Sequence, residues 1–285
     1  MTAKRNRSRT IEKSIKTIRK SAKRIRKSLK KWVPAIAALT KRYGLRSFTE
    51  SLERPHYRYC VYHGAWLAHQ LGHKRISVLE FGVAGGNGLA NLEVHAAKIA
   101  KIFGIEIEIY GFDTGEGLPE PVDYRDLPYH WKKGFYAMDQ ARLKSRLKYA
   151  KLVLGDIGAT TRHFAETSRP APIAAILFDL DFYSSTKASF GVFDLPKEYY
   201  LPRIFCYFDD ILGGHVELYN NYTGVRLAIS EFNQSHQDKK LDKAHYLLAR
   251  RVQNRWHRQI YIFHDFSHPA YNAFISPDNQ QLSLQ

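Results

Sequence analysis

The sequence of 285 residues contains little cysteine and little methionine, and it has no long apolar run. Its two cysteines, Cys60 and Cys206, are too few for a disulfide framework and lack the spacing of metal ligands. No stretch of 18 apolar residues is present that could cross a membrane. Because no apolar segment precedes a cleavage site of small residues, a signal peptide is not expected, and a reducing cytoplasmic location is the default.

Acidic residues are almost absent from residues 1–31, which hold fourteen Lys and Arg against the single Glu12. This segment has a net charge of +13, so the total of +17 leaves only +4 for the other 254 residues. Nucleic-acid binding by the whole surface is therefore disfavoured, because phosphate binding needs clustered positive charge near the site.

Apolar residues in the same segment recur at steps of three and four, which predicts a basic amphipathic helix. We expect an N-terminal extension over residues 1–45, with a second short helix near 34–43. An anionic membrane surface suits residues 1–32, at roughly 1 kcal/mol per Lys or Arg near the lipid headgroups. RNA binding and a solvated, partly frayed tail remain alternatives. The apolar positions are Ile11, Ile15, Ile18, Ala22, Ile25, Leu29 and Trp32.

Glycine is concentrated in one place, the stretch 76–88, where an apolar run leads into four glycines. The run predicts a buried strand, and the glycines permit positive φ angles and close approach of the backbone to a ligand. A dinucleotide fingerprint is disfavoured because positions 84 and 87, where it requires glycine, hold Ala84 and Asn87. An acid before the first glycine instead favours a cationic nucleoside such as S-adenosylmethionine, and a turn that only packs a helix on the sheet is the alternative. The candidate cofactor-binding residues here are Glu80, Gly82, Gly85 and Gly86.

Two further strand-like runs end in acids. Residues 105–112 lead to Asp113, whose carboxylate could accept hydrogen bonds from the vicinal hydroxyls of a ribose. The alternative is an acid that opens a turn before Thr114. Residues 151–155 form another short strand that is followed by Asp156.

The strongest chemical signal is a set of four aspartates after two predicted neighbouring strands. Asp179 and Asp181 follow an apolar run that begins at Pro172, and residues two apart on a strand face the same side. Asp209 and Asp210 follow the run 203–208. Four carboxylates at the carboxyl edge of a sheet would repel one another unless they bind a hard cation, for which Mg²⁺ is the natural choice. Separately, Asp181 could cap a helix near Ser184 and the other pair could open a turn.

Two other regions bear on the site and the sheet. The stretch 115–138 lacks periodicity but is rich in aromatic residues, which predicts a lid over a substrate or a loop packed onto the body. Near the C-terminus, residues 245–249 and 259–263 are predicted to form an antiparallel pair of strands.

These pieces together resemble the TylF-type macrocin O-methyltransferase family over about residues 76–235. The resemblance rests on the segments Glu80-Phe-Gly-Val, 112–121, 179–186, Phe208-Asp-Asp and 223–232. It implies an α/β fold of the Rossmann-like class I methyltransferase type over residues 46–275, with helices on both faces of a seven-stranded, mostly parallel sheet and one reversed edge strand. A frayed tail over residues 276–285 is also expected.

The resemblance further implies the cofactors S-adenosylmethionine and Mg²⁺ and an acceptor hydroxyl on a sugar or a phenolic natural product. On this basis Asp179, Asp209 and Asp210 would be the metal ligands, Asp181 the general base and Asp156 a contact of the adenine. Two alternatives remain open, namely a metal-dependent enzyme of the cephalosporin hydroxylase type and an inactive adaptor that docks on membrane or RNA through residues 1–32. A homo-oligomer is compatible with the sequence.

Overall fold

The computed structural model describes residues 54–276 of the chain. The predicted basic extension over residues 1–45, including both of its helices, therefore lies outside the described residues, as does all but the first residue of the predicted tail. Within residues 54–276, every helix is too short or too polar to cross a membrane.

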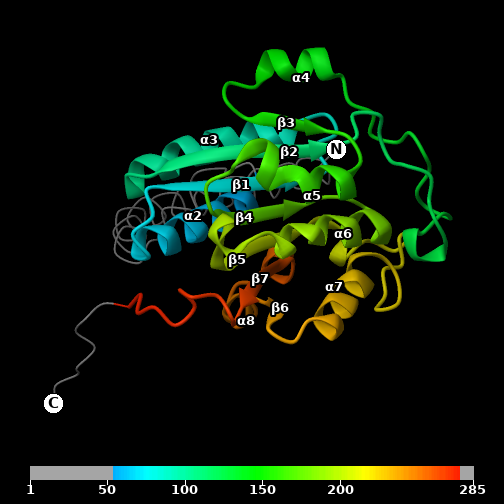
Figure 1. Cartoon of the computed structure of the whole chain (residues 1–285). Helices are drawn as coiled ribbons and strands as arrows, with labels where there is room; N and C mark the ends of the chain where they lie inside the picture. Colours follow the sequence, from blue (N-terminus) through cyan, green and yellow to red (C-terminus); the bar gives the residue numbers. More distant parts are fainter. Residues whose placement is uncertain (1–53, 277–285) are drawn as a thin grey trace, which may run out of the picture. The chain divides into compact units, whose positions relative to one another are not determined.

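A single seven-stranded sheet forms the centre of the body, in the order β3-β2-β1-β4-β5-β7-β6 (Figure 1). The first five strands are mutually parallel, and β7 runs antiparallel to both of its neighbours. The predicted seven-stranded, mostly parallel sheet is thus confirmed. The strands are β1 (Arg75–Phe81), β2 (Glu106–Asp113), β3 (Lys151–Leu154), β4 (Ile173–Phe178), β5 (Tyr200–Phe208), β6 (Lys239–Lys243) and β7 (Ile260–Asp265).

Two details of the predicted C-terminal strands are wrong. The reversed strand is β7, which lies inside the sheet, whereas the edge strand β6 is parallel to β5. The predicted strand 245–249 is instead the short helix α8 (His245–Leu248). Because β6 is an edge strand, it buries only Leu241 and is otherwise polar, so it lacks the apolar pattern of the central strands.

Helices cover both faces of the sheet, as predicted, and they create two apolar cores. The helices α2 (Pro55–Gln70) and α3 (Asn87–Phe103) pack on one face. The other face is covered by α5 (Ile157–Ser168), α6 (Tyr183–Ser189) and α7 (Gly224–Ser235) (Figure 1). The central strands β1, β4 and β5 are largely apolar because both of their faces are buried.

Several short helices connect these elements. The α-helix α4 spans Gln140–Arg146. The 3-10 helices are η2 (Tyr124–Asp126), η3 (Phe190–Asp194), η4 (Lys197–Tyr199), η5 (Asp209–Ile211) and η6 (Arg255–Arg258).

The strand order reverses between β1 and β4, which are adjacent in the sheet but distant in the sequence. In open α/β sheets, ligands bind outside the carboxyl ends of the strands at such a reversal. A ligand is therefore expected to bind at the loops that follow β1, β2, β4 and β5.

Candidate functional site

A cavity of about 740 Å³ lies at this edge of the sheet. Its wall includes residues that end or directly follow four strands, namely β1, β2, β4 and β5. All of the site residues predicted from the sequence line it, so the fold brings the two halves of the predicted site together. They are Glu80, Gly82, Gly85, Gly86, Asp113, Asp156, Asp179, Asp181, Asp209 and Asp210.

The glycine loop between β1 and α3 approaches neighbouring backbone closely. At Gly82, where φ is 84°, an added Cβ would lie 1.7 Å from the carbonyl oxygen of Asp179. Gly86 precedes the first residue of α3 with a φ of 74°. Gly85, in contrast, has open space where a Cβ would point and lines the cavity. The loop therefore leaves one stretch of bare backbone open to a ligand.

Asp113, the last residue of β2, holds the glycine loop in place. Its Oδ2 accepts hydrogen bonds from the backbone N–H groups of Val83 and Ala84, at 2.8 and 2.9 Å. Its Oδ1 accepts from the N–H of Gly115 at 2.7 Å. These bonds match the predicted turn-opening alternative, while the remaining lone pair of the carboxylate leaves room for one more donor.

Asp156 has a comparable structural function at the start of α5. It is the N-cap residue, and its Oδ1 accepts a hydrogen bond from the N–H of Ala159 at 2.8 Å. Such a bond satisfies one of the free N–H groups at the helix start. Asp156 also lines the cavity.

Glu80 is buried near the carboxyl end of β1 and has one oxygen without a partner. Its Oε1 accepts a 2.6 Å hydrogen bond from the hydroxyl of Tyr57 on α2. No hydrogen-bond partner for Oε2 is found among residues 54–276. Burial raises the pKa of Glu80 to about 7. An orphaned acceptor of this kind fits a cationic or hydrogen-bond-donating group of a ligand.

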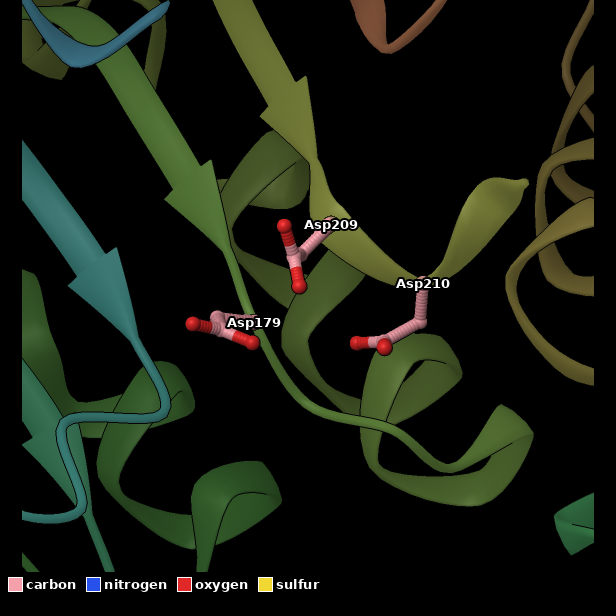
Figure 2. Close-up of side chains that lie close together, drawn as sticks. All are labelled: Asp179, Asp209 and Asp210. Carbon is pink, nitrogen blue, oxygen red and sulfur yellow. The ribbon is translucent and has the colours of Figure 1, made fainter. Parts of the chain in front are cut away.

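Three aspartates converge after β4 and β5 (Figure 2). Carboxylate oxygens of Asp179, Asp209 and Asp210 lie within 4.8 Å of one another. None of the ion pairs between described residues involves these side chains. Burial, together with the neighbouring carboxylates, raises the pKa of both Asp179 and Asp210. A set of three hard oxygen ligands at this spacing fits a divalent cation.

Asp181 joins this cluster for a reason that differs from the predicted one. The strand β4 ends at Phe178, and Asp181 has a left-handed backbone with a φ of 57°, so the alternation of side chains along a strand does not apply. Its N–H donates to Oδ2 of Asp210 at 3.0 Å. Burial and then Asp179 raise the pKa of Asp181 to about 7. The alternative of a helix cap is wrong, because the N-cap residue of α6 is Phe182.

The aromatic loop 115–138 is anchored to the body and also lines the cavity. The buried Asp126 accepts hydrogen bonds from the N–H of Val122 and from both the N–H and the hydroxyl of Ser184, all at 2.8 or 2.9 Å. Trp131 is buried against its neighbours, while Trp131 and Tyr136 both line the cavity. Both predicted functions of the loop, packing and covering a ligand, are compatible with this arrangement.

Sequence reasoning missed several residues of the cavity wall, among them Arg54 and Tyr219. Arg54 precedes α2, and its side chain lines the cavity beside Glu80. Tyr219 lies in the segment after η5, and its hydroxyl donates to Oδ1 of Asp210 at 3.4 Å. Neither residue ends a predicted strand or belongs to a recognised motif, so only the folded chain places it in the site.

Comparison with known proteins finds similar structures but no matching sequence family. No protein-family model and no curated protein matches the sequence. Similar solved structures include CalS11, a calicheamicin methyltransferase, at 22% identity with a TM-score of 0.47, covering 75% of this chain and 80% of that one. The O-methyltransferase NovP is 14% identical with a TM-score of 0.49, covering 73% and 77%.

A third similar structure is the MycE methyltransferase from the mycinamycin biosynthetic pathway in complex with Mg and SAH. It is 16% identical with a TM-score of 0.40, and the match covers 80% of this chain but 53% of MycE. Because all three TM-scores lie below 0.5, these likenesses establish no activity for this chain, and they do not confirm the TylF-type family.

Proposed function

We propose that the chain is an S-adenosylmethionine-dependent, Mg²⁺-assisted O-methyltransferase that acts on a hydroxyl of a sugar or phenolic acceptor. The observation that carries this proposal is that one cavity joins the glycine loop of β1 to the three-aspartate cluster of β4 and β5. A nucleoside cofactor and a metal-bound acceptor need that arrangement, because the methyl donor and the reacting hydroxyl must lie side by side.

The cofactor half of the cavity offers groups that suit S-adenosylmethionine. Gly85 presents bare backbone, Glu80 has an unpartnered acceptor oxygen, and Asp113 retains a lone pair for a ribose hydroxyl. Asp156 lines the wall where the resemblance places the adenine. When bound, S-adenosylmethionine supplies an activated methyl group on a sulfonium.

The other half would hold Mg²⁺ through Asp179, Asp209 and Asp210, whose mutual repulsion a divalent cation would remove. When bound, Mg²⁺ supplies a Lewis acid that lowers the pKa of a coordinated hydroxyl. The Asp181 carboxylate would take the proton that the acceptor hydroxyl loses as its oxygen gains the methyl group.

Aromatic side chains form a wall beside the aspartates that suits a ring-shaped acceptor. Trp131, Tyr136 and Tyr219 line the same cavity as the cluster. Their faces can stack on a sugar or a phenol. This wall supports a cyclic hydroxylated acceptor rather than a linear one.

Calorimetric titration of the full chain with S-adenosylmethionine tests the cofactor, and methyl transfer to a panel of glycosides and phenols with and without EDTA tests the metal. We expect binding, and turnover that stops with the chelator. Failure to bind S-adenosylmethionine contradicts the proposal, and turnover that persists in EDTA contradicts the metal assignment.

Product analysis and two variants separate this proposal from the two alternatives that the sequence left open. A cephalosporin-hydroxylase-like enzyme would give an oxidised product instead of a methylated one. An inactive adaptor would tolerate Asp209→Asn but lose function on deletion of residues 1–32. The cytoplasmic location, and docking of residues 1–32 on an anionic membrane surface or on RNA, stay predictions.

A further inference from the structure

We propose that Arg54, positioned by Tyr57 and Glu80, binds the α-carboxylate of the amino-acid part of the cofactor. This inference rests on the proposed function and names a cofactor contact that the glycine motif does not contain. Arg54 directly precedes α2 and lines the cavity together with Glu80 and Gly85.

A chain of hydrogen bonds sets the place of the guanidinium. Nη1 of Arg54 donates to the hydroxyl of Tyr57 at 3.3 Å, and that hydroxyl donates to Oε1 of Glu80 at 2.6 Å. The guanidinium carbon of Arg54 also lies 5.0 Å from the centre of the Tyr57 ring, within the range of a cation–π contact. Because Tyr57 is fully buried, its hydroxyl has a fixed position from which to orient the arginine side chain.

Within residues 54–276, the guanidinium of Arg54 makes a single hydrogen bond, to the hydroxyl of Tyr57. An arginine side chain has five N–H donors. None of the ion pairs between described residues includes Arg54. The described part of the chain leaves the remaining donors to an anion in the cavity, and the planar fork matches a carboxylate.

The charges of the cavity wall leave few places for an anionic group. Nine acidic residues line the cavity, whereas Arg54 and Arg255 are the two Lys or Arg residues that line it within the described part of the chain. Arg255 lies by the loop after β5, where its Nη2 donates to the carbonyl oxygen of Gly213 at 3.1 Å. Arg54 is therefore the cation on the side of the glycine loop.

S-adenosylmethionine has charges that complement this distribution. Its sulfonium and amino groups are cationic and suit an acidic wall, but its carboxylate requires a cation or N–H donors nearby. Glu80, with its unpartnered Oε2, lies two hydrogen bonds from Arg54 and offers an acceptor for the amino group. Arg54 and Glu80 together would hold the zwitterionic end of the cofactor.

The backbone of Arg54 gives independent support. Its φ of 52° and ψ of 64° are left-handed, although it is not a glycine and is followed by Pro55. A left-handed residue other than glycine costs roughly 1–2 kcal/mol. Residues in such conformations cluster at ligand sites, where the surrounding structure maintains them.

The competing explanation is that Arg54 only offsets the negative charge of the acids nearby. Burial lowers the pKa of Arg54, but Tyr57, Glu80, Asp179 and Asp209 raise it on balance. Decarboxylated S-adenosylmethionine distinguishes the two explanations, because it keeps the sulfonium and the amino group but lacks the carboxylate. Calorimetry of both ligands, at one Mg²⁺ concentration, would be done on the full chain and on Arg54→Gln, Arg54→Lys and Arg255→Gln.

We expect the unmodified chain to prefer S-adenosylmethionine over the decarboxylated ligand. Arg54→Gln should weaken binding of S-adenosylmethionine roughly 10- to 100-fold, the effect of losing hydrogen bonds to a charged group, and should not weaken binding of the decarboxylated ligand. Arg54→Lys should keep part of the preference, because it retains the charge without the fork. Arg255→Gln removes the same charge from the same cavity and should preserve the preference.

Three results would overturn the proposal. The first is an unmodified chain that binds both ligands equally, which needs no variant to fold. The second is an Arg54→Gln protein that binds S-adenosylmethionine as tightly as the original chain or more tightly, as charge offset predicts for a ligand with a net positive charge. The third is an Arg255→Gln protein that loses the preference as well. A chain that binds neither ligand overturns the proposed function itself, whereas the three results above leave that function in place.

Discussion

Acidic side chains in two regions of this molecule have different surroundings. The first region comprises the glycine loop and the helix α3 that follows it. There Asp113 accepts hydrogen bonds from three backbone N–H groups. Glu93 on α3 accepts hydrogen bonds from the N–H groups of three consecutive residues, Lys148 to Ala150. After β4, in contrast, Asp179 has no hydrogen-bond donor for its carboxylate among residues 54–276 and faces other acids. Acids with three N–H donors stabilise the fold, whereas acids that face one another need a ligand.

The largest expected effect is on catalysis. Asp181→Asn removes the proposed proton acceptor but leaves the three proposed metal ligands and the glycine loop intact. Methyl transfer should fall roughly 10²- to 10⁴-fold, the usual contribution of a general base, while calorimetry should show an S-adenosylmethionine affinity within a few fold of the original. Undiminished turnover would remove Asp181 from the mechanism.

The next effect is on stability at the structural acid. Glu93→Ala should lower the free energy of unfolding by about 3 kcal/mol. Three N–H groups would lose their acceptor, and because these groups are partly buried, water replaces it incompletely. Glu93→Gln is the matched control and should cost about 1 kcal/mol, because an amide oxygen can still accept these bonds. Urea denaturation measures both, and equal costs would contradict the assignment of Glu93.

The pH dependence of stability separates Glu80 from these satisfied acids. Burial raises its folded-state pKa from 4.5 to about 7, so its contribution to stability is fully present below pH 4.5 and is lost as the pH rises to about 7. Glu80→Gln should therefore gain about 2 kcal/mol relative to the original chain between pH 5 and pH 8. Urea denaturation of both proteins at pH 5 and pH 8 measures this. The same difference in unfolding free energy between Glu80→Gln and the original chain at both pH values would contradict the prediction.

The smallest expected effect has the opposite sign to that of Glu93→Ala. Asp179→Asn removes one of several mutually repelling carboxylates and breaks no hydrogen bond to its side chain within the described part of the chain. Without metal, the melting temperature should rise by about 2–4 °C, which corresponds to about 1 kcal/mol in a domain of this size. A fall in melting temperature would show that Asp179 stabilises the fold as Glu93 does.

The sequence predicts much of the fold because the central strands are buried on both faces. Continuous apolar runs mark β1, β4 and β5, and the acid after each run falls at the carboxyl edge of the sheet. The edge strand β6 escapes prediction since it buries a single side chain, Leu241, and has four lysine or aspartate residues around it. Apolar patterning detects burial, and an edge strand has little of it.

The positions of the site residues are also predictable, but their partners are not. The sequence places Asp113 at the end of a strand without showing that its oxygens hold Val83 and Ala84. It likewise gives no sign that Glu93 reaches a loop more than fifty residues later. Arg54 belongs to the cavity through the packing of α2 on the sheet, a contact that no local pattern encodes.

Mn²⁺ binding, followed by electron paramagnetic resonance, tests most directly whether the facing aspartates form a cation site. Mn²⁺ accepts the same oxygen ligands as Mg²⁺ and is a suitable probe. The full chain should bind one Mn²⁺ that Mg²⁺ displaces, Asp179→Asn should bind it weakly or not at all, and Glu93→Gln should bind it normally. No bound Mn²⁺, or equal binding in Asp179→Asn and the original chain, would contradict the metal site.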